Sequence, residues 1–346
     1  MDLVHRLGME LPVVQAPMAG VQDERLAIAV NEAGGLGSLP CAMLAPDGMR
    51  DALRAIRLRT TRAVNVNFFC HAPPVPDPGR EAAWRRLLAP YYAEFGIDPG
   101  TAVEGAQRKP FDRDACDAIE PFRPEVVSFH FGLPAPVLLA RVRAWGAQVW
   151  SSATTLDEAR WLDAHGVDVV IAQGIEAGGH RGHFLRDDLV GQPPTFELVA
   201  QIAAAVRKPV VAAGGIGDAR GVATALRLGA AAVQCGTAYL LCREATTSAV
   251  HRAALRSDAV CETAVTNLFS GRPARGIVNR LMRELGAMRT DVPAFPLAAV
   301  ALAPLRAREE RSGRGGFSPL WAGQDAALPA AATAGEITRA LARVDG

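Results

Sequence analysis

Short apolar runs rich in valine and alanine alternate along the chain with longer amphipathic segments. Eight of the runs have the length and composition of buried strands. They lie at 11–15, 34–38, 63–67, 126–129, 148–151, 167–171, 209–213 and 231–234. The segments between them carry apolar residues at helical spacing, as at 24–32 and 47–59. This alternation predicts a parallel sheet whose strands are joined by crossover helices.

Two of the later helices have recognisable end signals. Thr155 and Glu158 have the spacing of a capping box, and Gly166 stands where a left-handed C-terminal residue is favoured. Asp218 is expected to cap the next helix, which ends at Gly229. These positions fix where the chain turns between strand and helix.

Eight strands in this order favour a closed (β/α)₈ TIM barrel over an open sheet. A flavodoxin-like or Rossmann sheet is the alternative, but no G-x-G-x-x-G follows the first strand. Residues 70–124 form an insertion after strand three, and 257–326 follow strand eight. We expect a barrel over 1–256, a lid or substrate-side region over 257–326, and a C-terminal helix over 327–346 that returns to the barrel.

Charge and composition limit the classes of binding partner that we expect for this protein. The 346 residues contain 37 Lys and Arg against 36 Asp and Glu, so nucleic acid is not expected and a small molecule is favoured. Neither a signal peptide nor an apolar run of membrane-spanning length is recognisable, so no membrane contact is expected. The six cysteines form no C-x-x-C pair, which favours a reducing, cytoplasmic location and no metal centre.

The loops after strands seven and eight have the composition of a phosphate site. The first contains Gly214 and Gly215, and the second is Gln234, Cys235, Gly236 and Thr237. Glycines let backbone N–H groups approach a phosphate, and barrels commonly use these two loops for that purpose. Tight turns without a ligand are the alternative.

The segment after strand six combines an amide, a glycine pair and an imidazole. Gln173 is placed to hydrogen-bond the edge of a planar heterocycle, and Gly178 and Gly179 permit close approach of the backbone. His180 then reaches a substrate as acid, base or electrostatic partner, with an ordinary pKa near 6.5. Glu176 is better explained as a cap than as a catalytic group.

Two further loops reach the same end of the barrel. Ala16, Pro17 and Met18 follow strand one and present small or apolar groups to one face of a flat cofactor. Asn67 follows strand three, where its amide suits a phosphate or a heterocycle; its alternative role is a turn cap.

Together these residues resemble the nitronate monooxygenases, formerly called 2-nitropropane dioxygenases. The resemblance covers most of the chain in the family's order, and Asn65–Phe69 with Phe129–Gly132 resembles the class I branch. The matching segments are Gln15–Met18, Asn65–Phe69, Ser128–Gly132, Ser151–Thr155, Gln173–Gly182, Ala213–Ile216, Gln234–Thr237 and Pro319–Gln324.

The resemblance implies non-covalent FMN and oxidation of an alkyl nitronate, such as propionate 3-nitronate, by O₂ to a carbonyl compound and nitrite. It makes His180 the catalytic histidine. FMN would be bound by the residues named above in the five loops after strands one, three, six, seven and eight: Ala16, Pro17, Met18, Asn67, Gln173, Gly178, Gly179, Gly214, Gly215, Gln234, Cys235, Gly236 and Thr237. Candidate substrate-side residues are His130, Trp321 and Gln324. A homodimer is left open.

Other functions remain open at this point. An FMN-dependent enoyl-acyl carrier protein reductase shares the Glu176–His180 segment and both phosphate loops, and an NADH:quinone reductase is a third enzyme. An inosine-monophosphate-dehydrogenase-like barrel is disfavoured because strand six is followed by no cysteine. A flavin-binding subunit without turnover is the non-enzymatic alternative.

Overall fold

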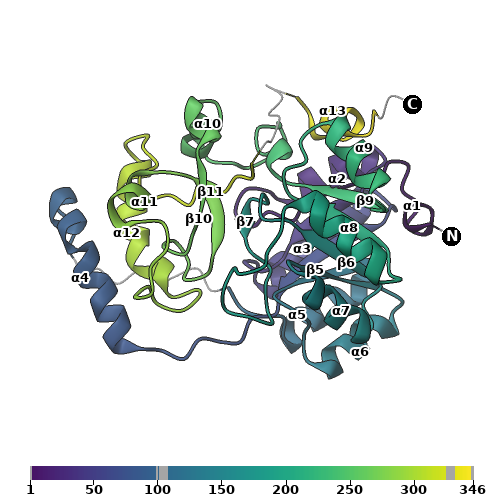
Figure 1. Cartoon of the computed structure of the whole chain (residues 1–346), viewed down its shortest axis with the longest axis horizontal. Coiled ribbons are helices and arrows are strands. Elements are labelled where there is room, and N and C mark those ends of the chain that lie inside the picture. Colours follow the sequence, from purple (N-terminus) through teal and green to yellow (C-terminus); the bar gives the residue numbers. More distant parts are fainter. Residues whose placement is uncertain (1, 99, 101–107, 325–331, 344–346) are drawn as a thin grey trace.

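The computed structural model describes residues 2–98, 100, 108–324 and 332–343. Eight parallel strands form a barrel in the order β1-β9-β8-β6-β5-β4-β3-β2, and a bridge between Val14 and Leu36 joins its two ends (Figure 1). The strands are β1 (Val13–Gln15), β2 (Gly37–Pro40), β3 (Val64–Phe69), β4 (Val126–His130), β5 (Gln148–Ala153), β6 (Val169–Gln173), β8 (Val210–Ala213) and β9 (Ala232–Cys235). The predicted (β/α)₈ barrel is confirmed, and the open sheet is wrong.

Helices cover the outside of the barrel. They are α2 (Glu24–Glu32), α3 (Pro46–Arg59), α5 (Arg113–Ile119), η1 (Glu120–Phe122), α6 (Pro136–Ala144), α7 (Leu156–Ala164), α8 (Thr195–Ala205), α9 (Ala219–Arg227) and α13 (Ala334–Leu341). The main core lies between them and the strands, where residues such as Leu53, Val149 and Ile202 are buried. Short α1 (Leu3–Arg6) instead closes the barrel floor, because Leu3 packs with the inward-facing Trp150.

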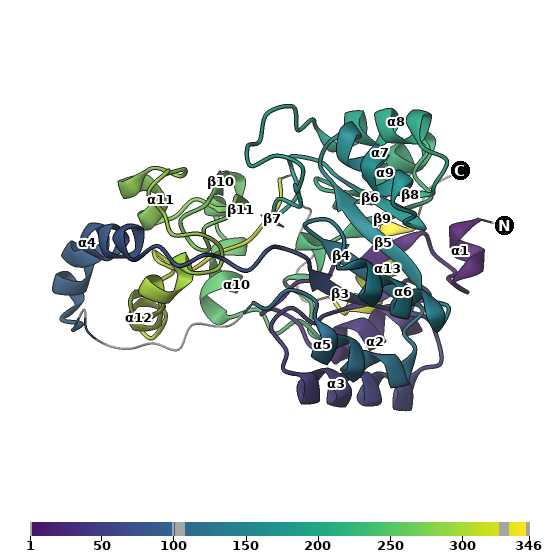
Figure 2. The same ribbon diagram turned by 90° about the horizontal axis from the view of Figure 1, so that it is seen from below.

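A second lobe lies beyond the opposite end of the barrel, on the left of Figures 1 and 2. It contains α4 (Pro78–Phe95), α10 (Ala249–Leu255), η3 (Asp258–Cys261), β10 (Thr263–Thr266), β11 (Ala274–Ile277), α11 (Arg280–Leu285) and α12 (Ala298–Glu310). Its own core joins Trp84 and Tyr92 of α4 to Leu302 and Phe317. The Trp84 indole and the Tyr92 hydroxyl donate to backbone carbonyls of α12. The insertion after strand three and the region after strand eight thus pack together.

A small antiparallel sheet connects the lobe to the barrel. Its third strand is β7 (Gly179–His180), which belongs to the connection after β6 and pairs with β11 of the lobe. Ala274 is the partner of His180, and Arg275 is the partner of Gly179. The segment predicted as a flexible glycine-rich loop therefore contains a paired strand.

Most of the predicted end signals are present. Asp218 accepts a hydrogen bond from the Gly221 N–H, and Gly166 has a φ of 77°. The capping box at Thr155 is only half correct, because Glu158 turns away from the Thr155 N–H. Its carboxylate accepts from Thr154 and from the Phe184 N–H, so it anchors the loop after β7.

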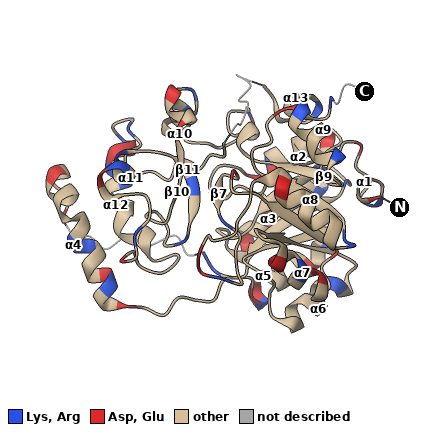
Figure 3. Cartoon of the chain, in the orientation of Figure 1, with Lys and Arg blue, Asp and Glu red and all other residues tan. Residues whose placement is uncertain are grey.

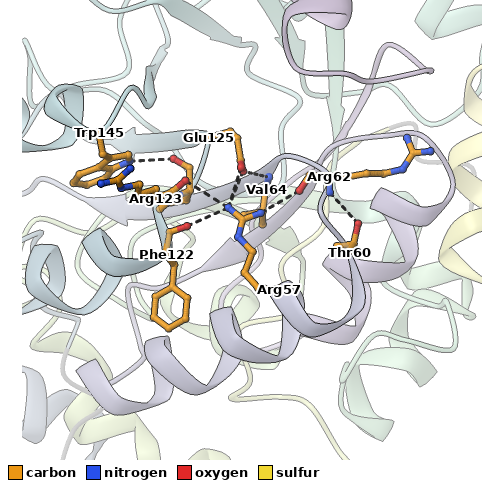
Figure 4. A network of polar contacts seen from close by, with 9 residues as sticks. Arg57, Thr60, Arg62, Val64, Phe122, Arg123, Glu125 and Trp145 are labelled. Carbon is orange, nitrogen blue, oxygen red and sulfur yellow. Dashed lines mark hydrogen bonds and ion pairs between the residues drawn. The ribbon is translucent and has the colours of Figure 1, made fainter.

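At the barrel floor, Arg57 near the end of α3 forms hydrogen bonds with the segments that precede β3 and β4 (Figure 4). Its guanidinium donates to the carbonyls of Arg62 and Phe122 and to both carboxylate oxygens of Glu125, each at 3.0–3.3 Å. Glu125 also accepts from the Val64 N–H at 3.0 Å. One side chain thereby fixes the entry points of two neighbouring strands.

Charged residues of both signs are interspersed over the outer helices (Figure 3). Several form ion pairs one helical turn apart. Within the described ranges, no helix is both long enough and apolar enough to cross a membrane. The helix α13 packs against α2, and its Thr338 hydroxyl lies 2.9 Å from that of Tyr239 in η2 (Thr237–Tyr239). The predicted boundary at 326/327 falls outside the described residues, and the division into domains stays a prediction.

Candidate active site

An open cavity lies at the carboxyl ends of the barrel strands, facing the second lobe. Every residue predicted for the site lines it: Ala16, Pro17, Met18, Asn67, His130, Gln173, Gly178, Gly179, His180, Gly214, Gly215, Gln234, Cys235, Gly236, Thr237, Trp321 and Gln324. The structure brings them together; their individual roles stay predictions.

The glycines of the cavity wall are required by backbone geometry. Gly214 has a φ of 118°, and a Cβ placed there would lie 2.8 Å from the Thr195 hydroxyl oxygen. A Cβ on Gly178 would lie 2.5 Å from the Gly323 nitrogen. Such distances are below van der Waals contact, so only glycine allows these segments to pack so closely.

Several polar groups in the same wall have no hydrogen-bond partner in the described part of the chain. The N–H groups of Gly215 and Gly236 donate no hydrogen bond to any described residue. The side-chain oxygen of Gln234 is buried and has no partner within the described part of the chain. Buried polar groups are normally satisfied, so donors and an acceptor left open at two adjacent glycine loops indicate a polar ligand.

A segment from the end of the lobe closes over this wall. The Gly323 N–H donates to the Thr237 hydroxyl at 2.9 Å, and the Gln324 N–H donates to the Glu176 carbonyl at 2.9 Å. The Glu176 carboxylate accepts from the N–H and hydroxyl of Thr195 at the start of α8. Glu176 therefore acts as a cap, as predicted, and also positions the closing segment through its backbone.

The backbone of His180 is held from three sides. Its carbonyl accepts from the Gln173 amide at 3.0 Å and lies 3.1 Å from Nε2 of His130, while β7 pairs with β11. The Gln173 oxygen in turn accepts from the Gly182 N–H at 2.7 Å. Gln173 thus organises the His180 loop, in addition to any contact it makes with a heterocycle.

Buried Arg181 supports this arrangement from beneath. Its guanidinium donates to the carbonyls of Gln173 and Gly174 and to the side chain of Gln192. Burial lowers the pKa of Arg181 to about 9, so the group remains a cation at neutral pH.

The His180 ring lies against a partner from the lobe. Its Nε2 is 2.9 Å from the hydroxyl oxygen of Ser270, in the turn between β10 and β11. Because a hydroxyl both donates and accepts, Ser270 supports either neutral tautomer of the imidazole. Nδ1 has no partner among the described residues and is the atom available to a substrate.

The surroundings favour the neutral form of His180. Burial first, then the positive charge of Arg108 and the neighbouring groups His130, Arg272 and His71, lower its pKa well below 6.5. The ordinary value near 6.5 expected from sequence is therefore wrong. At neutral pH the imidazole acts as a hydrogen-bonding or proton-accepting group and not as a cation.

His130 has its ring nitrogens occupied by the protein. Nε2 faces the His180 carbonyl, so it carries the proton, and Nδ1 accepts from the Ser152 hydroxyl at 3.1 Å. Burial lowers the pKa of His130 to about 3, in agreement with a neutral ring. This candidate substrate-side residue contributes its ring surface to the cavity and holds His180.

Asn67 has the same kind of fixed orientation. Its amide nitrogen donates to the hydroxyl of Ser128 at 2.9 Å and to the Ser128 carbonyl at 3.2 Å. The amide oxygen accepts from no described residue, and Asn67 lines the cavity.

Aromatic rings enclose the space in front of His180. Phe295 and Trp321 have ring centroids 5.3 and 5.6 Å from that of His180, and Phe69 is at 6.1 Å. Residues that sequence reasoning missed are Ser270, Phe295, Arg108 and His251. All of them lie in the insertion or the lobe, where no periodic pattern or short motif marks a position.

Comparison with known proteins shows the family to which the chain belongs. The model of the family described as "Nitronate monooxygenase" matches residues 2–343. The chain belongs to the nitronate monooxygenase family.

Individual relatives cover nearly all of the chain. A nitronate monooxygenase of Pseudomonas aeruginosa is 42% identical over 97% of this chain and 96% of its own length. Another, of Paraburkholderia phytofirmans, is 40% identical over 99% and 94%. Among solved structures, a nitroalkane oxidase of Streptomyces ansochromogenes is 37% identical with a TM-score of 0.88, covering 98% of this chain and 96% of that one. FabK of Thermotoga maritima is 27% identical with a TM-score of 0.72, covering 99% and 94%.

Proposed function

We propose that the protein is an FMN-dependent enzyme that oxidises alkyl nitronates with O₂ to a carbonyl compound and nitrite. The observation that carries the proposal is the placement of His180. Its ring lies in the wall of a cavity that also contains two open glycine loops, in a chain of the nitronate monooxygenase family. A ligand-sized space, a positioned imidazole and a phosphate-type site are the parts that this reaction requires.

The residues present fit FMN. The free N–H groups at Gly215 and Gly236 suit its phosphate, and the unpartnered oxygen of Gln234 suits a hydroxyl or ring N–H donor. The Asn67 oxygen is a second acceptor, while Ala16 and Met18 offer an apolar surface for a flat ring. When bound, FMN supplies the electron-accepting chemistry; the protein supplies binding, orientation and electrostatics.

In this proposal, His180 either donates a hydrogen bond to the substrate or accepts a proton from it. With a nitronate, an Nδ1–H donates to a nitro oxygen while Ser270 donates to Nε2. With a neutral nitroalkane, unprotonated Nδ1 takes the α-proton while Ser270 accepts from Nε2–H. The aromatic rings of Phe69, Phe295 and Trp321 exclude water around the reacting carbon.

The test is oxygen consumption by purified, yellow holoenzyme. We expect uptake of O₂ with propionate 3-nitronate, release of nitrite, and no acceleration by NADH. Rapid bleaching of the flavin by NADH under nitrogen, without nitronate-dependent O₂ uptake, would contradict the proposal and indicate a reductase. Colourless protein that cannot be reconstituted with FMN would contradict the cofactor assignment.

A further inference from the structure

One cation in the cavity wall has no role in the chemistry described so far. Arg108 lies in the connection between α4 and α5 and lines the same cavity as His180. Its Nη1 is buried and has no hydrogen-bond partner within the described part of the chain. Its guanidinium carbon lies 5.9 Å from the centre of the Phe295 ring.

The other buried arginines of this region donate hydrogen bonds to groups of the protein, although Nε of Arg272 has no partner in the described part of the chain. Arg181 donates to two carbonyls and an amide, Arg272 donates to the His183 carbonyl, and Arg275 donates to the Ile175 carbonyl. Arg108 forms no ion pair with a described carboxylate, and burial followed by the charge of Arg306 lowers its pKa. A buried guanidinium without a counter-ion is costly, so the arrangement indicates an anion supplied by a ligand.

The position of Arg108 relative to His180 determines which anion fits. Both groups lie against Phe295, with the guanidinium carbon at 5.9 Å and the imidazole centroid at 5.3 Å from the centre of that ring. Arg108 is also close enough to His180 for its charge to lower the pKa of the imidazole. A substrate whose nitronate contacts His180 can therefore place a second anionic group on Arg108.

We propose that Arg108 is a specificity-determining residue that binds a carboxylate at the far end of a short-chain nitronate. The proposal rests on the proposed function and adds to it the residue that binds the end of the substrate opposite the nitronate. An Arg–carboxylate pair is charge-assisted and can be bidentate, which gives geometric discrimination as well as affinity.

The first experiment compares two nitronates of equal chain length on holoenzyme. Propionate 3-nitronate carries the carboxylate, and propyl-1-nitronate lacks it. Losing one hydrogen-bonded ion pair costs about 1.5–3 kcal/mol, or a factor of roughly 10–150. We expect Arg108→Gln to lower kcat/KM for propionate 3-nitronate by about 100-fold, and to lower that for propyl-1-nitronate at least tenfold less. Arg108→Lys should recover part of the loss because it keeps the charge.

Arg306→Gln is the matched control. Arg306 is close enough to lower the pKa of Arg108, but it is half-exposed, pairs with Glu310 and does not line the cavity. The control removes a nearby positive charge without touching the site. It should therefore preserve the discrimination between the two nitronates. Equal losses on both nitronates in Arg108→Gln would overturn the proposal, because they would place the nitronate itself on Arg108.

A second measurement is independent of turnover. Calorimetric titration of holoenzyme with succinate and with butyrate compares a dianion and a monoanion of the same length. Wild-type protein should bind succinate at least tenfold more tightly, and Arg108→Gln should lose that preference. Oxidation of nitronates without any preference for succinate would overturn the role of Arg108 alone. A preference for succinate in a protein that oxidises no nitronate would overturn the proposed function and leave the anion site standing.

Discussion

The Nε2 atom of His180 lies 2.9 Å from the hydroxyl oxygen of Ser270, a residue 90 positions later in the chain. His180 follows barrel strand β6, whereas Ser270 stands in the β10–β11 turn of the second lobe. The contact therefore joins the two parts of the molecule at the mouth of the cavity. Ser270 also lies 3.3 Å from the Arg272 carbonyl, so its hydroxyl is fixed by its own turn.

Replacement of His180 by asparagine should remove turnover and leave FMN bound. General acid–base catalysis by a positioned group is worth about 10²–10⁴-fold, so kcat with nitroethane should fall at least 100-fold. The flavin content per chain, read from the absorbance spectrum, should stay close to that of wild type. Loss of flavin with unchanged activity per bound flavin would contradict the catalytic assignment.

The same histidine sets the pH dependence of the wild-type enzyme. Because burial and nearby cations lower the pKa of His180 well below 6.5, the neutral ring dominates at pH 7. Protonation inactivates a base, so kcat/KM with nitroethane should be constant above pH 6.5 and fall only well below it. An acidic limb centred near 6.5 would show that the group is not desolvated as the structure indicates.

Substitution of Ser270 by alanine should impair catalysis more than binding. The imidazole loses the partner that fixes the orientation of its ring, and we expect kcat with nitroethane to fall about tenfold while KM changes less than threefold. Ser270→Thr keeps the hydroxyl and should recover most of kcat. If alanine and threonine reduce kcat equally and lower the Tm equally, Ser270 is only a packing residue.

The barrel could be predicted because its determinants are local. Runs such as 126–129 and 209–213 are apolar on both faces, as strands covered by helices must be. Strand two was placed at 34–38 but lies at Gly37–Pro40, since Gly34 has a φ of 93° and turns the chain before the strand starts. Glycine loops and a histidine beside them likewise give local signals, and these residues do line one cavity.

The lobe side of the site could not be predicted in the same way. Contacts between residues far apart in sequence place Ser270, Phe295 and Arg108 in the site. The pairing of Ala274 with His180 is one such contact. The pKa shift of His180 could not be predicted for the same reason. Its direction depends on burial and on the charges of Arg108 and Arg272, which only the folded structure brings close. A sequence gives residue types at these positions but not the distances between them.

Arg57 should contribute to stability and not to catalysis. Arg57→Met removes hydrogen bonds to three carbonyls and to Glu125 at the barrel floor (Figure 4). We expect the free energy of unfolding to fall by about 2 kcal/mol, with activity per folded molecule unchanged.

The matched control is Arg54→Met, one turn earlier in α3. Arg54 is exposed and pairs only with Asp51, so its loss should cost at most about 0.5 kcal/mol. Urea unfolding curves of the two variants measure the difference. Equal destabilisation would show that the Arg57 network adds nothing beyond an ordinary surface ion pair.

Three buried histidines should make the protein sensitive to acid. Burial lowers the pKa values of His71, His183 and His251 to about 4 in the folded chain. The unfolded chain binds a proton at each near pH 6.5, so between pH 6.5 and 4 it holds more protons than the folded chain. The free energy of unfolding should therefore fall as the pH drops through this window, by up to about 1.4 kcal/mol per pH unit for each histidine.

His183→Gln tests this proton linkage. Between pH 6.5 and 5, the free energy of unfolding of the variant should fall less steeply than that of wild type. The two slopes should differ by about 1 kcal/mol per pH unit, whatever the stability of the variant at pH 7. His5→Gln is the control, because His5 is exposed in α1 and its loss should leave the wild-type dependence intact. Urea unfolding at both pH values measures the slopes. A slope in His183→Gln equal to that in His5→Gln would mean that His183 binds a proton as readily in the folded protein as in the unfolded chain, and that its burial does not exclude the charge.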